Sequence, residues 1–231
     1  MRIFLSIVLS ALVVALPAQG GTITGNVRAE GRTAPGAGTS DGAYSSRKFK
    51  FVEKVDYTTM RDFVVYIDGG ITNSVAPTNS TLQVTTERVA QQGAMFTPHV
   101  LPVQRGAMVE WPNYDEIFHN VFSVSDAKSF DLDLYKGNPP GKQVTFDRSG
   151  RVDVFCSIHE RMHCIVLVLD NPHFASADEK GNYRITNVPA GTYILKAWHD
   201  RLPTEAREIT VPADGEVRAD FVLGVKNLPK H

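Results

Sequence analysis

The sequence has almost no net charge, because 24 Lys and Arg residues stand against 25 Asp and Glu in 231 residues. It also contains no run of basic residues. A dedicated nucleic-acid-binding protein needs a basic surplus for its phosphate contacts, so this class is excluded. Charged residues make up 21% of the chain and hydrophobic residues 42%, which excludes wholesale disorder. The length suits one large domain or two small ones.

Long apolar runs are missing except near the first residue. Arg2 precedes an apolar run over residues 3–16, and Ala18 and Gly20 have the small-residue spacing of a cleavage site. This pattern predicts a secretory signal peptide over residues 1–20, because the run is shorter than the roughly 20 residues that span a membrane. An uncleaved anchor is the alternative. We expect a periplasmic protein, extracellular if there is no outer membrane, with no membrane span after cleavage.

Convincing amphipathic helices are also missing, and short strand-like segments recur instead. The segments 63–67, 107–111 and 152–155 are apolar or alternating and are bounded by turn residues. The 18 Gly and 13 Pro of the chain fit frequent turns. The sequence therefore predicts an all-β protein built as a sandwich or barrel.

Cysteine is scarce: the chain contains Cys156 and Cys164 alone. In an exported protein, two cysteines predict a disulfide. Cys156 also begins the spacing C-x-x-H-x-x-M with His159 and Met162, on a short loop between two expected strands. His119, from another loop, could complete a site with four donors.

The donor types indicate which metal such a site would hold. Two imidazoles, one thiolate and a weak thioether form the ligand set of blue-copper electron-transfer sites. Structural zinc sites take four strong Cys or His ligands without Met, haem attachment needs C-x-x-C-H, and calcium needs oxygen donors. The pattern therefore favours copper, one Cu(I)/Cu(II) ion per chain, over a Cys156–Cys164 disulfide.

Two separated segments resemble the plastocyanin/amicyanin branch of the cupredoxins, and most closely amicyanin and the small methylamine-utilisation-type blue copper proteins. They read Asn113-Tyr114-Asp115 before His119-Asn120-Val121, and Phe155-Cys156-Ser157-Ile158-His159 before Met162. The resemblance implies a Greek-key β-sandwich of about eight strands over residues 82–170.

The resemblance also assigns roles within that domain. It implies that His119, Cys156 and His159 are the equatorial metal ligands, that Met162 is the axial ligand, and that electrons pass at the solvent edge of His159. Asn113 and Asn120 are the candidates for hydrogen bonds around the ligands, and the resemblance gives Asn113 the role of tying the two ligand loops together. Ordinary turn chemistry is the alternative for both residues.

Two residues depart from the family pattern, because His163 and Cys164 follow Met162 directly. Strand alternation would place Cys164 on one face with Val166 and Val168 as a buried, unreactive thiol. His163 could replace or supplement Met162 as a ligand, and His99 is a further possible alternative ligand.

The flanking segments resemble the carboxypeptidase regulatory-like (transthyretin-like) β-sandwich. The resemblance rests on the turns and strands of residues 178–200 and on the strand Gly21–Val27. It implies a second, smaller β-sandwich built from residues 21–75 and 171–231, with the cupredoxin domain inserted between them. A simple N-to-C order of two domains is the alternative.

The sequence as a whole predicts a periplasmic mononuclear type 1 copper protein without enzymatic activity. It would carry single electrons between transient redox partners, such as a c-type cytochrome or a periplasmic dehydrogenase. Two alternatives remain open. One is a copper storage or delivery protein, and the other is a metal-free exported β-sandwich binding protein with a Cys156–Cys164 disulfide.

Overall fold

The computed structural model describes residues 20–31, 56–71, 86–137 and 141–224. Within these ranges the chain is all-β, apart from the 3-10 turn η2 (Tyr57–Thr59), which confirms the predicted fold class. None of the described residues belongs to a helix long and apolar enough to cross a membrane. The predicted signal peptide, save Gly20, and the start of the predicted cupredoxin domain at residues 82–85 lie outside the described residues.

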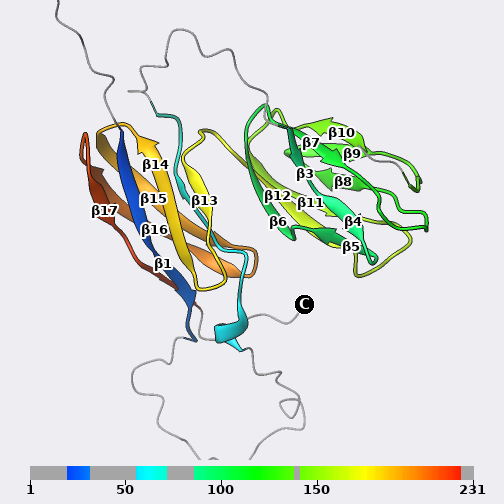
Figure 1. Cartoon of the computed structure of the whole chain (residues 1–231), viewed down its shortest axis with the longest axis horizontal. Helices are drawn as coiled ribbons and strands as arrows, with labels where there is room; N and C mark the ends of the chain where they lie inside the picture. The colour runs from blue at the N-terminus through cyan, green and yellow to red at the C-terminus, as the bar shows by residue number, and fades with distance from the viewer. Residues whose placement is uncertain (1–19, 32–55, 72–85, 138–140, 225–231) are drawn as a thin grey trace, which may run out of the picture.

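The strands divide into two sandwiches that lie side by side (Figure 1). We call the one built from the middle of the chain the central sandwich. Its larger sheet has the order β6-β12-β11-β8-β9 and its smaller sheet the order β10-β7-β3, with the hairpin β4-β5 beside them. Their bounds are β3 (Thr86–Arg88), β4 (Ala90–Gln92), β5 (Met95–Thr97), β6 (Val100–Gln104), β7 (Met108–Trp111), β8 (Phe122–Ser125), β9 (Lys128–Asp131), β10 (Lys142–Thr145), β11 (Gly150–Phe155) and β12 (His163–Leu169).

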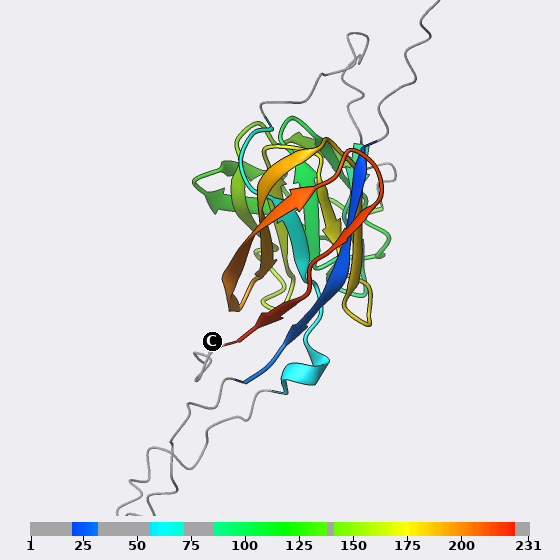
Figure 2. The same cartoon turned by 90° about the vertical axis from the view of Figure 1, so that its left-hand side faces the viewer.

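The other unit, the terminal sandwich, combines strands from both parts of the chain that flank the central one. One sheet has the order β14-β1-β17, with β18 also paired to β1, and the other has the order β13-β2-β15-β16. Figure 2 shows β1 running beside the C-terminal strands, with which it pairs in parallel. The bounds are β1 (Gly21–Ala29), β2 (Val64–Ile67), β13 (Phe174–Ser176), β14 (Asn182–Val188), β15 (Gly191–His199), β16 (Leu202–Val211), β17 (Glu216–Arg218) and β18 (Phe221–Leu223).

Period-two alternation explains how each sandwich forms its core. Every second residue of β1 is buried, with Ile23 and Val27 at 0% and 1% exposure, because successive side chains of a strand point to opposite faces. The same alternation fills the central sandwich with Val152 and Val154 of β11 and with Val166 of β12.

The two sandwiches also share an apolar cluster of their own. Side chains of β6 and β12 in the central sandwich meet side chains of β2, β13 and β15 in the terminal one. The buried members are Val64, Val100, Ile165, Leu167 and Leu169, with Tyr66, Phe174 and Trp198 packed against them. Four sheets therefore stack in sequence, with an apolar layer in each gap.

Candidate metal centre

His119 lies in the connection between β7 and β8 and is completely buried, at 0% exposure. Its backbone pairs with Tyr135, since His119 N–H donates to Tyr135 C=O at 3.0 Å and Tyr135 N–H returns a bond at 2.8 Å. Backbone hydrogen bonds therefore hold the loop that carries the imidazole in place.

The second donor loop spans residues 156–162 and joins β11 to β12. Phe155 and His163, which flank the loop, are paired in the antiparallel ladder. The loop also closes on itself, because Cys156 N–H donates to Met162 C=O at 3.2 Å and Met162 N–H donates to His159 C=O at 2.9 Å. One short turn thus gathers three of the four expected donors.

The donor atoms of the two loops converge. His119 Nδ1 lies 3.0 Å from His159 Nδ1, and Cys156 Sγ lies 3.6 Å from the same nitrogen. Among the described residues, His119, Cys156 and His159 form the single group of three donors, all within 4.8 Å of one another. Met162 is 1% exposed and packs in the same apolar cluster as Cys156.

These separations fit one ion. Metal bonds of about 2.0–2.1 Å to nitrogen and about 2.3 Å to sulfur allow two donors to lie up to roughly 4.1–4.4 Å apart around a shared ion. The His119–His159 and Cys156–His159 separations are both shorter than that limit, and the third pair of donors lies within 4.8 Å. The borderline nitrogens and the soft thiolate also suit copper, so the residues present fit the expected group.

Asp115 supports His119 in a way that the sequence analysis did not anticipate. Its Oδ2 lies 2.8 Å from His119 Nε2, the ring nitrogen that faces away from the other donors. The backbone N–H groups of Gly93 and Ala94, in the turn between β4 and β5, donate to the same carboxylate at 2.7 and 2.9 Å. Burial acts to raise the pKa of Asp115, but these hydrogen bonds and the one from His119 outweigh it and hold the pKa below its ordinary value.

The two asparagines have different partners. Asn120 Oδ1 accepts hydrogen bonds from the backbone and the hydroxyl of Ser157, at 2.7 and 2.8 Å, and so joins the two donor loops. Asn113 Nδ2 donates instead to Ile117 C=O and Tyr135 C=O, both at 3.0 Å. In the structure, the tie expected of Asn113 is therefore made by Asn120, while Asn113 fixes the course of the His119 loop.

A buried tyrosine completes the support of the His119 loop. The Tyr135 hydroxyl donates to Trp111 C=O at 2.6 Å and accepts from Gln91 Nε2 at 2.5 Å. Burial raises the pKa of Tyr135 to about 12, so the phenol stays protonated at neutral pH. Sequence reasoning missed this group because its partners lie 24 and 44 residues away.

Both cysteines are free thiols in the structure. Cys164 is 1% exposed and lies in the core cluster that also contains Val166 and Val168, on the inner face of β12. Burial raises its pKa well above the ordinary value. Cys164 is therefore a protonated core side chain, and Cys156 remains available as a sulfur donor.

His99 and His163 lie together, on the opposite face of β12 from Cys164. Their rings meet edge to face with centroids 5.4 Å apart, and His163 Nε2 lies 3.0 Å from Asp153 Oδ1. The structure does not bring either ring into the group of converging donors.

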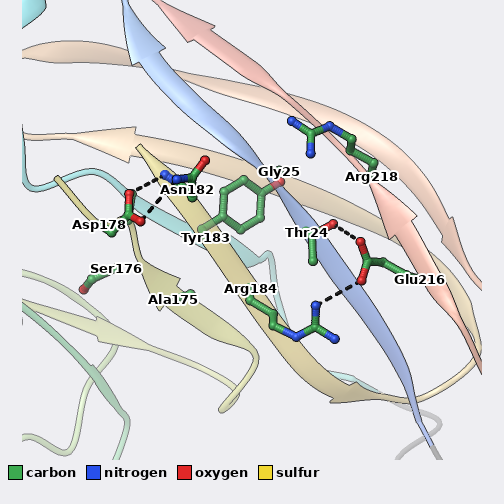
Figure 3. A pocket seen from close by; sticks show the side chains of 11 residues that line it. Thr24, Gly25, Ala175, Ser176, Asp178, Asn182, Tyr183, Arg184, Glu216 and Arg218 are labelled. Carbon is green, nitrogen blue, oxygen red and sulfur yellow. Dashed lines mark hydrogen bonds and ion pairs between the residues drawn. The ribbon is translucent and has the colours of Figure 1, made fainter. Parts of the chain in front are cut away.

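A shallow groove of about 520 Å³ lies in the terminal sandwich (Figure 3). Two of its charged side chains pair with each other: Arg184 lies 3.0 Å from Glu216, which also accepts from Thr24 at 2.6 Å. No Cys or His lines it, so it offers none of the metal donors found in the central sandwich.

Comparisons with known proteins find partial matches among solved structures. Comparison with family models and with curated proteins finds no match. The solved structures include a copper-containing nitrite reductase from Thermus scotoductus (25% identity, TM-score 0.34) and a reduced Cu(I) form of an amicyanin mutant (24%, 0.32). A purple cupredoxin from Nitrosopumilus maritimus matches at 23% identity with a TM-score of 0.30.

The matches cover 38%, 36% and 36% of this chain, and 23%, 81% and 98% of the respective structures. The chain thus spans less than a quarter of the nitrite reductase. These proteins are similar to little more than a third of this chain.

Proposed function

We propose that the protein is a mononuclear type 1 copper protein that carries single electrons between redox partners. One observation carries the proposal: Cys156 Sγ and the Nδ1 atoms of His119 and His159 converge, and Met162 is buried in the same apolar cluster as Cys156. This is the donor set of blue-copper electron-transfer sites.

Bound copper would supply the one-electron change between Cu(I) and Cu(II). The chain's own part is to keep its donors in place through that change. His119 is fixed by Asp115, and Ser157 of the other loop is fixed by Asn120. Such outer hydrogen bonds orient ligands and tune the metal. Donors that are already positioned need little rearrangement, which favours fast electron transfer.

Burial separates this proposal from copper storage or delivery. His119, Cys156 and Met162 are 0%, 6% and 1% exposed, and His159 alone of the four reaches an intermediate exposure. A protein that hands over its metal needs donors that an acceptor can reach. Here a partner can approach only the His159 edge, which suits exchange of an electron.

Exposed apolar side chains on both donor loops indicate the kind of partner. Ile117, Phe118 and Ile158 are each about half exposed, although large apolar side chains are usually buried. They lie close to the metal centre in the chain, and the ammonium group of Lys136 lies over the Phe118 ring. We infer transient docking of a redox protein, such as a c-type cytochrome or a dehydrogenase, mainly through apolar contact, so that added salt changes the association rate little.

The remaining expectations are part of the same proposal. We propose that residues 1–20 direct export to the periplasm, or outside the cell where there is no outer membrane. We also propose that the terminal sandwich is of the carboxypeptidase regulatory-like type, with the cupredoxin-like domain inserted in it.

The test is a visible absorption titration of the protein with Cu(II), without reductant. We expect an intense blue or green band that saturates at one copper per chain. The band should be lost in Cys156→Ser and kept in Cys164→Ser, the matched control. A wild-type protein without such a band, or a band that depends on Cys164 instead, would refute the proposal.

A further inference from the structure

The strand β12 links the metal centre to the terminal sandwich. It begins at His163, directly after Met162, and every later residue of the strand is buried. Its inner face carries Cys164 and Val166 in the core of the central sandwich. Its outer face carries Ile165 and Leu167 in the cluster shared with the terminal sandwich. Packing on both faces leaves this strand little freedom to shift.

His163 contacts the segments on both sides of the donor loop. It follows Met162 in sequence, and its ring stacks on Phe155, with centroids 4.8 Å apart and an interplanar angle of 27°. Phe155 in turn precedes Cys156. The position of this one imidazole is therefore coupled to both ends of the loop that supplies three donors.

A chain of polar contacts runs from His163 to the terminal sandwich. His163 Nε2 lies 3.0 Å from Asp153 Oδ1, and the Arg151 guanidinium binds both oxygens of Asp153 at 2.7 and 2.8 Å. The remaining guanidinium nitrogen of Arg151, Nη1, donates to the C=O of Asp200 at 3.2 Å. Asp200 lies in the turn between β15 and β16.

A second path ends at the same turn. His99 Nδ1 lies 3.3 Å from His163 C=O, and His99 Nε2 lies 4.0 Å from the Asp200 carboxylate. Large apolar contacts between domains suppress their relative motion. The polar contacts in addition link one particular turn of the terminal sandwich to one particular residue beside the donor loop. They connect Asp200 to the first residue after Met162 from two sides.

We propose that the terminal sandwich is a positioning element for the copper-ligand loop, acting from Asp200 on His163 by two paths, one through Arg151 and Asp153 and the other through His99. The inference rests on the proposed function. It predicts that a change made at the contact between the sandwiches alters the metal centre, although no altered residue is a donor or touches one.

The test compares three single variants with the wild-type protein. Arg151→Met removes the guanidinium but keeps an apolar stem. Asp200→Asn removes the carboxylate charge that faces His99 Nε2 but keeps the C=O that accepts from Arg151, so it tests the second path. Arg184→Met is the control. It removes a guanidinium of the terminal sandwich that pairs with Glu216 and that takes no part in the polar contacts between Asp200 and His163. The readouts are the Cu(II) electron paramagnetic resonance spectrum, the intensity ratio of the visible bands, and the copper affinity against a competing chelator.

We expect Arg151→Met to change the spectrum and to weaken copper binding about tenfold, the lower end of the loss seen when an outer support is removed. Asp200→Asn should shift the spectrum in the same direction, and it decides the question if Arg151→Met does not fold. Arg184→Met should match the wild type. Wild-type spectra and affinity in both test variants, even with a lower melting temperature, would overturn the inference while leaving the proposed function intact. A wild-type protein that binds no copper would refute the proposed function and this inference with it.

Discussion

Replacing Asp115 by Asn tests whether the carboxylate behind His119 belongs to the metal centre. One of its oxygens accepts from the Ala94 N–H at 2.9 Å and faces His119 Nε2 at 2.8 Å, and the other accepts from the Gly93 N–H at 2.7 Å. An amide has only one acceptor oxygen, so its NH₂ group must face either an N–H donor of the turn or the imidazole. The substitution therefore removes the negative charge and loosens the orientation of the ring.

The expected size follows from outer supports of metal ligands in general. Their loss weakens metal binding by roughly 10–100-fold, which corresponds to about 1.4–2.7 kcal/mol of binding free energy. The reduction potential should also rise, because the lost negative charge stabilised Cu(II) more than Cu(I). The assays are a competitive chelator titration and a potentiometric titration followed by the visible band.

The neighbouring carboxylate provides the control for charge alone. Glu116 is exposed, so Glu116→Gln removes the same formal charge without touching His119. It should leave the affinity within about twofold of wild type, because exposed charges are strongly screened. If Asp115→Asn and Glu116→Gln behave alike, Asp115 does not orient the ligand and the reasoning from its three contacts is refuted.

Three further substitutions test neighbouring parts of the structure. Cys164→Ala should keep the visible band and lower the free energy of unfolding by about 1 kcal/mol, the typical effect of a single substitution, because it removes only one buried atom; loss of the band would show that Cys164 is a ligand. Asn120→Ala removes both bonds to Ser157 and should cost about 1–3 kcal/mol at roughly 0.5–1.5 kcal/mol each, measured by urea unfolding; an unchanged midpoint would contradict this. The pKa of His99 is raised, first by its contact with Asp200, so its contribution is complete below the ordinary value of 6.5 and is lost as pH rises through the raised pKa. His99→Gln should lack the loss of stability that the wild type shows as pH rises above about 6.5, and an identical pH dependence in both proteins would count against it.

The donor set could be predicted from the sequence because three of its four residues are close together in the chain. Cys156, His159 and Met162 share one turn, so their spacing alone places them together. The inward direction of Cys164 was also predictable, since side chains alternate along a strand. The same alternation points His163 outward, although adjacency in the chain had made it a possible ligand.

The support of the donors could not be read in this way because its partners are distant in sequence. Asp115 acts together with a turn about 20 residues earlier, whose Gly93 and Ala94 have φ values of +63° and +53°. Ala94 carries no sequence signal for that conformation, which is uncommon outside glycine. Without the pairing of β4 with β5, nothing in the sequence directs two backbone N–H groups toward a particular carboxylate.

The contact between the sandwiches escapes prediction for a different reason. Alternation tells which residues of a strand share a face, but it does not tell what covers that face. In β12 both sets are apolar, Cys164 and Val166 on one side and Ile165 and Leu167 on the other. A strand of a lone sandwich would expose one of these sets to water. The apolar character of the second set therefore already requires a cover, and the terminal sandwich supplies it over the strand that begins next to Met162. A metal centre built at the end of a strand buried on both faces is then a property of the whole stack and not of the central sandwich alone.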